Sequence, residues 1–129
     1  MSAIQETAYP RFRTDIPQQE LDAVYTPTAV EQRWARRRTR QILERFFLLL
    51  HLKAYQKQGF FSSSVGLPGD LRRHIAQCLG LDKQPTKAQR QQYDRSATRK
   101  RHIPWIRTYV GSRTLDEAAH AWLSSQAKK

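Results

Sequence analysis

Residues 39–58, TRQILERFFLLLHLKAYQKQ, contain the densest run of apolar side chains in the chain. Phe47 and Leu48 fill the gaps in a helical pattern, so a helix here is apolar on almost every side. Such a helix must be surrounded by others. We therefore predict a buried central helix that ends at Gly59, a residue type that commonly terminates helices. Its core-type positions are Ile42, Leu43, Phe46, Leu49, Leu50 and Leu52.

The region before this helix predicts two further helical segments. Pro17 suits a first helical turn, and a short amphipathic helix should follow, with apolar positions at Leu21, Val24 and Tyr25. The next helix begins near residue 28, either at Thr26-Pro27 or at a capping box formed by Thr28 and Glu31. The helical pattern then continues to residue 58, with a break or kink expected at 38–41.

After Gly59, residues 60–66 predict a loop whose two aromatic side chains fold back onto the central helix. Pro68 opens a helix with apolar residues at Leu71, Ile75 and Leu79, and Gly80 and Leu81 predict a Schellman ending. Residues 82–86 form a linker, and Thr86 can cap a brief helix that runs to about residue 93.

Two more helices are expected in the last third of the chain. The first begins at Asp94 or Ser96 and continues to Val110, with Gly111 as the residue that terminates it. Pro104 should kink this helix. Its core-facing residues are Ile103, Trp105, Ile106 and Tyr109. Thr114 to Glu117 form a capping box for the other. That helix should bury Leu115, Ala118, Ala119, Trp122 and Leu123.

These patterns predict an all-α fold, a compact multi-helix bundle, because no alternating strand pattern is present. Residues 74–81 are similar to the first helix and turn of a helix-turn-helix, although the helix that follows has Thr86 and Gln89 where that motif requires apolar residues. We divide the chain into an N-terminal arm (1–13), a helical domain (14–124) and a frayed tail (125–129).

The positive charge is concentrated between residues 33 and 107. This stretch holds eighteen Lys and Arg residues against four acids, within a net charge of +12 for the whole chain. Arg outnumbers Lys by sixteen to seven, which favours bidentate contact with phosphate or guanine. Such an unbalanced field indicates a polyanionic partner, and nucleic acid is the leading candidate.

Two clusters carry most of this charge. The first, Arg33 to Arg40, has no acid within residues 32–42 and is expected to clamp phosphates, although a solvated helix face is the alternative. The second, Arg95 to Arg107, is the main candidate for insertion into a DNA groove, with Arg95, Arg99 and His102 on one helical stripe. The predicted DNA contacts are Arg33, Arg36, Arg37, Arg38, Arg40, Arg72, Arg73, Lys87, Arg90, Arg95, Arg99, Lys100, Arg101 and Arg107.

Other classes of function find little support in the sequence. His74 and Cys78 lie one helical turn apart, but zinc needs further ligands, so core or surface placement is expected and no metal or cofactor is predicted. No signature of a catalytic nucleophile is present, and the spacing of Asp70 and Asp94 suggests helix caps. We expect no membrane span, no small-molecule substrate and a cytoplasmic, nucleoid-associated bacterial protein.

The order and spacing of several segments resemble the N-terminal region of Tn-three-type (class II) replicative transposases. The resemblance covers residues 9–111 and rests on Tyr9–Arg13, Glu20-Leu21, Val24–Thr28, Leu48–Leu50 with Lys53 and Gln56, Gly59–Phe61, His74–Ala76, Leu79–Leu81, Tyr93-Asp94, Arg99–His102, Ile106-Arg107 and Tyr109–Gly111.

The resemblance implies a helical DNA-binding domain that recognises the terminal inverted repeats of a transposon. In that family a distant C-terminal domain with a metal-binding carboxylate triad cleaves and transfers the strands. This chain stops before that domain, so the resemblance implies a recognition module and not an enzyme, with double-stranded DNA and the remaining transposase domains as partners. The alternatives are a helical protein-interaction or dimerisation module and an RNA-binding domain.

Overall fold

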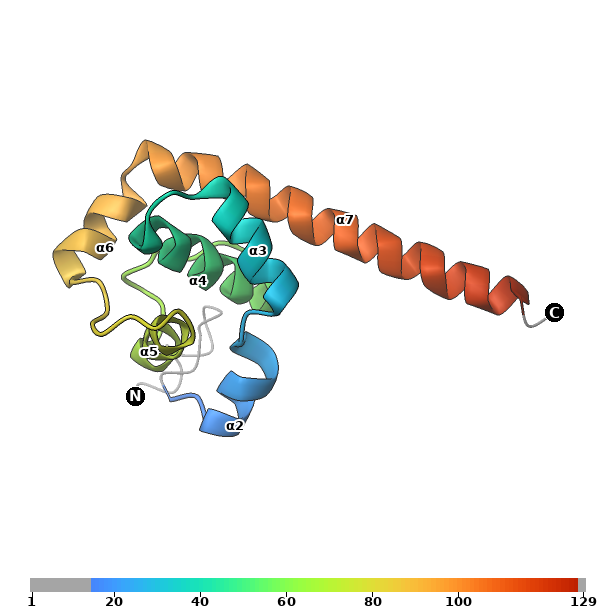
Figure 1. Cartoon of the computed structure of the whole chain (residues 1–129), viewed down its shortest axis with the longest axis horizontal. Coiled ribbons are helices and arrows are strands. Elements are labelled where there is room, and N and C mark those ends of the chain that lie inside the picture. The colour runs from blue at the N-terminus through green and yellow to red at the C-terminus, as the bar shows by residue number, and fades with distance from the viewer. Residues whose placement is uncertain (1–14, 128–129) are drawn as a thin grey trace, which may run out of the picture.

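The computed structural model describes the backbone of residues 15–127 and the side chains of residues 15–112. Its described part is helical and contains no strand, which confirms the predicted all-α fold (Figure 1). In chain order the elements are α2 (Gln18–Glu20), the π-helical turn η1 (Leu21–Tyr25), α3 (Ala29–Arg38), α4 (Ile42–Gln58), α5 (Gly69–Cys78), α6 (Lys87–Asp94) and α7 (Ala97–Ala127).

Helix α4 lies at the centre and packs against α3, α5, α7 and η1. All five residues from Phe46 to Leu50 are buried, as is Leu52, so the predicted central helix is confirmed. Of the other predicted core positions, Leu43 is half-buried and Ile42 is exposed. As the first residue of the helix it is 41% exposed. Burial of this apolar surface, at about 25 cal/mol per Å², is the main source of the fold's stability.

The expected break before α4 is present at residues 39–41. Thr39 adopts an extended conformation and its hydroxyl donates to the Ala35 carbonyl (2.8 Å), which satisfies one of the last carbonyls of α3. At the other end of α3, Thr28 and Glu31 form the capping box: the Glu31 N–H donates to Thr28 Oγ1 (3.1 Å) and the Thr28 N–H to Glu31 Oε1 (2.9 Å). Thr28, and not Thr26, therefore begins this helix.

The remaining predicted boundaries of the middle region are also confirmed. Gly59 has a φ of 83° and ends α4. Gly80 has a φ of 74° and completes a Schellman ending of α5, in which the Leu81 N–H donates to the Ala76 carbonyl (2.9 Å) and the Gly80 N–H to that of Gln77 (3.1 Å). Of the two loop aromatics, Phe61 stacks on Tyr55 with ring centroids 4.4 Å apart, whereas Phe60 is exposed.

The connections around α6 differ from the predicted helix-turn-helix-like arrangement. Helices α5 and α6 are separated by residues 79–86, which is longer than the three or four residues of that motif. The short connection lies instead between α6 and α7, where only residues 95 and 96 intervene. In Figure 1, α7 turns away from α6 at this point and runs across the domain. We call the junction of residues 87–101 the α6–α7 corner.

The prediction that a helix ends at Gly111 and another starts at Thr114 is wrong, because α7 continues through both residues to Ala127. Gly111 does not adopt the positive φ of a helix-terminating glycine. Pro104 also lies inside the helix, where it leaves the Lys100 carbonyl without its helical donor. Both Lys100 and Pro104 are exposed, so water can satisfy that carbonyl.

The second half of α7 extends beyond the helical body (Figure 1). The predicted burial of Leu115, Ala118, Ala119, Trp122 and Leu123 concerns side chains outside the described residues, as does the N-terminal arm at 1–13. The helix includes residues 125–127, which the sequence had assigned to the tail.

A buried ion pair joins α3 to α4 and was not anticipated from the sequence. The Lys53 ammonium donates to Glu31 Oε1 at 3.0 Å, and the side chains are only 8% and 5% exposed. The Gln56 amide donates to the other Glu31 oxygen (2.8 Å). Burial raises the pKa of Glu31, but its hydrogen bonds and the Lys53 charge outweigh this and lower it overall. Glu31 is therefore held as a carboxylate, and its charge is neutralised inside the protein.

Replacing Lys53 by Met should lower the free energy of unfolding by about 3 kcal/mol, because Glu31 would be left buried and unpaired. Urea denaturation of the parent and of K53M measures the difference. Lys57, exposed on the same helix, provides the matched control K57M, which should change stability by less than about 0.5 kcal/mol. Equal stability of the two variants would show that the ion pair contributes nothing.

Candidate nucleic-acid interface

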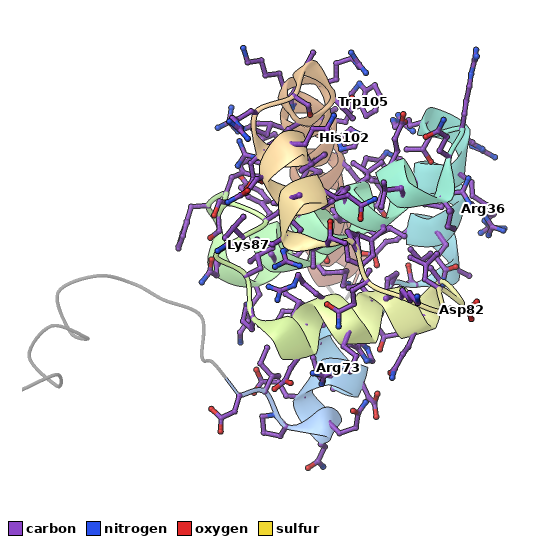
Figure 2. All side chains as sticks on the ribbon, turned by 90° about the vertical axis from the view of Figure 1, so that its left-hand side faces the viewer. Arg36, Arg73, Asp82, Lys87, His102 and Trp105 are labelled. Carbon is purple, nitrogen blue, oxygen red and sulfur yellow. The ribbon has the colours of Figure 1, made fainter. Side chains whose placement is uncertain are left out.

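The fourteen predicted DNA contacts divide into an exposed and a half-buried group. Arg72, Arg90 and Arg99 are half-buried. The others lie exposed and are Arg33, Arg36, Arg37, Arg38, Arg40, Arg73, Lys87, Arg95, Lys100, Arg101 and Arg107. In Figure 2, Arg36 and Lys87 are on opposite sides of the view, so these cations are distributed over more than one face.

The three half-buried arginines hold loops inside the domain. Arg72 donates to the Leu67 carbonyl before α5, Arg90 to the Pro85 carbonyl before α6 (2.9 Å), and Arg99 to the Ser62 carbonyl after α4 (3.2 Å). Burial, together with the charge of Arg90, lowers the pKa of Arg72. We therefore remove these three from the set of freely available contacts. Periodicity alone could not separate them from their exposed neighbours.

The arginines of α3 lie on a surface without a free acid on the same helix. Arg33, Arg36, Arg37 and Arg38 are exposed, while Glu31 is buried against Lys53. The prediction that Arg40 shares their helical face is wrong, because it lies in the bend after α3. The Arg38 guanidinium is 5.1 Å from the ring centroid of Trp34, which itself packs at 4.7 Å on Tyr109. This contact places α3 beside α7.

At the α6–α7 corner the structure reverses the predicted helical stripe. Arg99, His102 and Ile106 face inward, because His102 and Ile106 belong to the core. Lys100 and Arg101, which lie outside that stripe, are the exposed side chains. The Arg101 guanidinium donates to Thr98 Oγ1 at 3.2 Å. The first turns of α7 thus present Lys100 and Arg101 outward, next to the exposed Arg95.

Tyr93 fixes this corner to the central helix. Its hydroxyl lies 2.7 Å from His102 Nδ1, and its ring is parallel to that of Phe47 with centroids 4.1 Å apart. Tyr93 therefore links α6 to both α4 and α7, and the exposed cations of the corner stand on a rigid base.

Neither acid that was expected to cap a helix does so. Asp94 accepts the backbone N–H groups of Ser64 (2.8 Å) and Val65 (3.4 Å), and its Oδ1 lies 3.9 Å from Arg99 Nε. Asp70 accepts the Ile16 N–H and pairs with Arg73, each at 3.1 Å. Ser96 is the residue that caps α7, because its hydroxyl accepts the Arg99 N–H (3.2 Å).

The histidines of this region are neutral and add no charge to the surface at pH 7. Burial, reinforced by the nearby Arg99, lowers the pKa of His51 to about 3, and burial with the nearby Arg101 lowers the pKa of His102 to about 4. His51 Nε2 lies 2.7 Å from Ser64 Oγ. Burial also raises the pKa of the Tyr93 hydroxyl. These groups act as neutral hydrogen-bonding partners within the core.

A hollow of about 290 Å³ opens at the α6–α7 corner, between α6, the start of α7 and the start of α4. Phe47, Tyr93 and Leu43 contribute its apolar part. Its polar lining includes Gln41, Gln89, Gln92, Ser96 and Thr98, and Glu44 is its one acid. These amides carry no charge and were therefore not among the predicted contacts. The sequence feature that could have indicated a polar site here is the pair Gln91-Gln92, which lies between Arg90 and Arg95.

Within the part of the chain whose side chains are described, no group of three potential ligands could hold a metal ion. His74 is buried, and its Nε2 lies 2.8 Å from Thr26 Oγ1 and 3.7 Å from Cys78 Sγ. His74 and Cys78 lie on α5, on the side that packs against η1. No helix in the described range has the length and apolar character that a membrane crossing requires.

The sequence as a whole matches one family of protein domains. The match spans residues 1–129, and the family is described as "Domain of unknown function (DUF4158)". The chain therefore belongs to the DUF4158 family. No curated protein and no solved structure matches it.

The buried histidines predict a pH-dependent stability. Below pH 6.5 the unfolded chain binds protons at His51 and His102 that the folded chain excludes, so the free energy of unfolding is highest above pH 6.5 and falls toward pH 4. Each histidine can contribute a slope of up to about 1.4 kcal/mol per pH unit. Urea denaturation between pH 7.5 and 4.5 measures this slope, and H51Q should reduce it. A constant stability across that range would contradict the neutral, buried state.

Proposed function

We propose that this domain binds double-stranded DNA and recognises the terminal inverted repeats of a transposon on behalf of a transposase. The observation that carries the proposal is the state of its charges. Eleven predicted cations are exposed, whereas Glu31, Asp70 and Asp94 are engaged with Lys53, Arg73 and loop N–H groups. Salt-dependent binding to a polyanion is the expected consequence.

The α6–α7 corner is the element that we propose enters a groove. Its two helices are joined by two residues, and the exposed Lys100 and Arg101 lie in the first turns of the second helix. Helix-turn-helix proteins contact base edges with the N-terminal residues of their second helix. Arg33, Arg36 and Arg37 on α3 form a separate group of proposed phosphate contacts, which add affinity without selecting sequence.

The relationship to transposases is the second support for the proposal. The DUF4158 family is found in transposase-like proteins. The residues shared with the N-terminal region of Tn-three-type transposases extend this to the recognition of transposon ends. DNA cleavage and strand transfer then belong to other domains of the same transposase, so the role of this domain is recognition and not catalysis.

One feature favours a second function, that of a protein-interaction module. The C-terminal half of α7 extends beyond the helical body (Figure 1), and its sequence has apolar residues at helical spacing from 115 to 123. The two functions can be tested separately, because the apolar positions at 115–123 do not overlap the α6–α7 corner at 87–101. Loss of DNA binding with unchanged self-association would assign the two activities to different parts of the chain.

The DNA-binding proposal is tested with duplexes that carry the terminal inverted repeat of the parent transposon. The domain should bind this duplex about tenfold or more tightly than a scrambled duplex, since each mismatched base pair costs roughly 1–3 kcal/mol. The logarithm of the affinity should fall linearly with the logarithm of the salt concentration. Fluorescence anisotropy measures both. Absence of binding to either duplex would exclude the proposal, and stronger binding to single-stranded RNA would favour the RNA alternative.

The double variant K100A/R101A should bind the inverted-repeat duplex at least about fivefold more weakly and prefer it less over the scrambled duplex, because each lost contact to a base edge costs roughly 1–3 kcal/mol. Both side chains are exposed, so the variant should keep the stability of the parent. The matched control K57A/K83A removes the same charge from exposed positions outside the corner. Equal affinities of the two variants would mean that only total charge matters and that the corner is not the contact surface.

A further inference from the structure

We propose that the hollow at the α6–α7 corner receives one unstacked nucleobase of the bound DNA. This inference rests on the proposed function, because it identifies what part of the DNA that surface recognises. To read a base that remains stacked, a protein side chain must protrude into the DNA groove. The hollow is instead concave, with a volume of about 290 Å³, so here a group of the DNA would enter the protein.

The chemistry of the lining fits a planar group with hydrogen-bonding edges. Half-buried Leu43 provides most of the apolar contact, because Phe47 and Tyr93 are only 3% and 6% exposed. Gln41, Gln92 and Thr98 provide neutral donors and acceptors. Amide side chains pair with the edges of bases, and proteins that take a base out of its stack hold it by such contacts and by aromatic or apolar packing. The carboxylate of Glu44 repels phosphate but can accept a hydrogen bond from an exocyclic amine. The lining therefore favours adenine or cytosine over thymine.

The charge around the hollow fits the rest of the nucleotide. Arg101 is placed at the rim by its hydrogen bond to Thr98 (3.2 Å). Arg40 is exposed and adjoins the lining residue Gln41 in the chain. Arg95 faces the other side of α6, where its Nε donates to the Gln91 carbonyl (3.4 Å). Cations thus stand next to Thr98 and Gln41, at two places along the lining of the hollow. This pattern matches a base directed inward with its flanking phosphates on the outside.

The experiment compares three DNA duplexes of the same sequence: fully paired, with one bulged adenine, and with an abasic site in place of that adenine. The abasic duplex keeps the distorted backbone and removes only the base. The full chain should bind the bulged-adenine duplex about fivefold or more tightly than the abasic duplex, because only the duplex with the base can form hydrogen bonds with the amides of the hollow. A bulged thymine should bind more weakly than adenine.

Gln92 and Gln91 supply a matched pair of variants. Both are exposed on α6, but only Gln92 lines the hollow. Q92A should lose the preference for adenine over the abasic site, and Q91A should retain it. Equal affinity for the adenine and abasic duplexes, with salt-dependent binding intact, would overturn this inference and leave the DNA-binding proposal standing. If none of the duplexes binds, both proposals fail.

Discussion

The burial of α4 is the constraint on which the rest of the structure depends. A helix that is apolar around nearly its whole circumference cannot lie at a surface, so η1, α3, α5 and α7 must cover it. The covering helices then turn their polar sides outward. Because those helices are rich in Arg and Lys, the covering of one apolar helix also places most of the positive charge on the exterior. Core and charged surface are two results of the same packing.

The acids determine how much of this charge remains available. Glu31 is buried with Lys53, Asp94 holds the loop after α4, and Asp70 pairs with Arg73 and fixes Ile16. Glu31 and Asp94 stabilise the fold from within, whereas Asp70 remains partly exposed in its ion pair with Arg73. The exterior thereby keeps an excess of guanidinium groups, which costs self-repulsion in the free protein and is relieved when a polyanion binds. Binding of DNA, as we propose, would remove that cost.

The α6–α7 corner combines rigidity with polar surface. Tyr93 joins three helices through its ring contact with Phe47 and its bond to His102, so the core holds the backbone of this corner in place. A pre-organised backbone loses less conformational entropy on binding. The neighbouring hollow adds amide groups that could distinguish one base from another, whereas the α3 arginines could supply only affinity. We infer from this division that specificity and affinity reside on different helices.

Local sequence patterns are enough to predict the helical class, the central helix and most helix boundaries. These features depend on local chemistry: the capping box at Thr28, the left-handed Gly59 and Gly80, and the apolar run of α4. The sequence does not show whether Gly111 ends a helix, because a glycine permits that ending without requiring it. Nor could it decide which arginines are free. Arg99 was predicted to contact DNA but bonds to the carbonyl of Ser62, thirty-seven residues earlier in the chain. Only the tertiary structure decides such partners, because contacts between distant segments depend on how the helices pack and not on the spacing of residues along one helix.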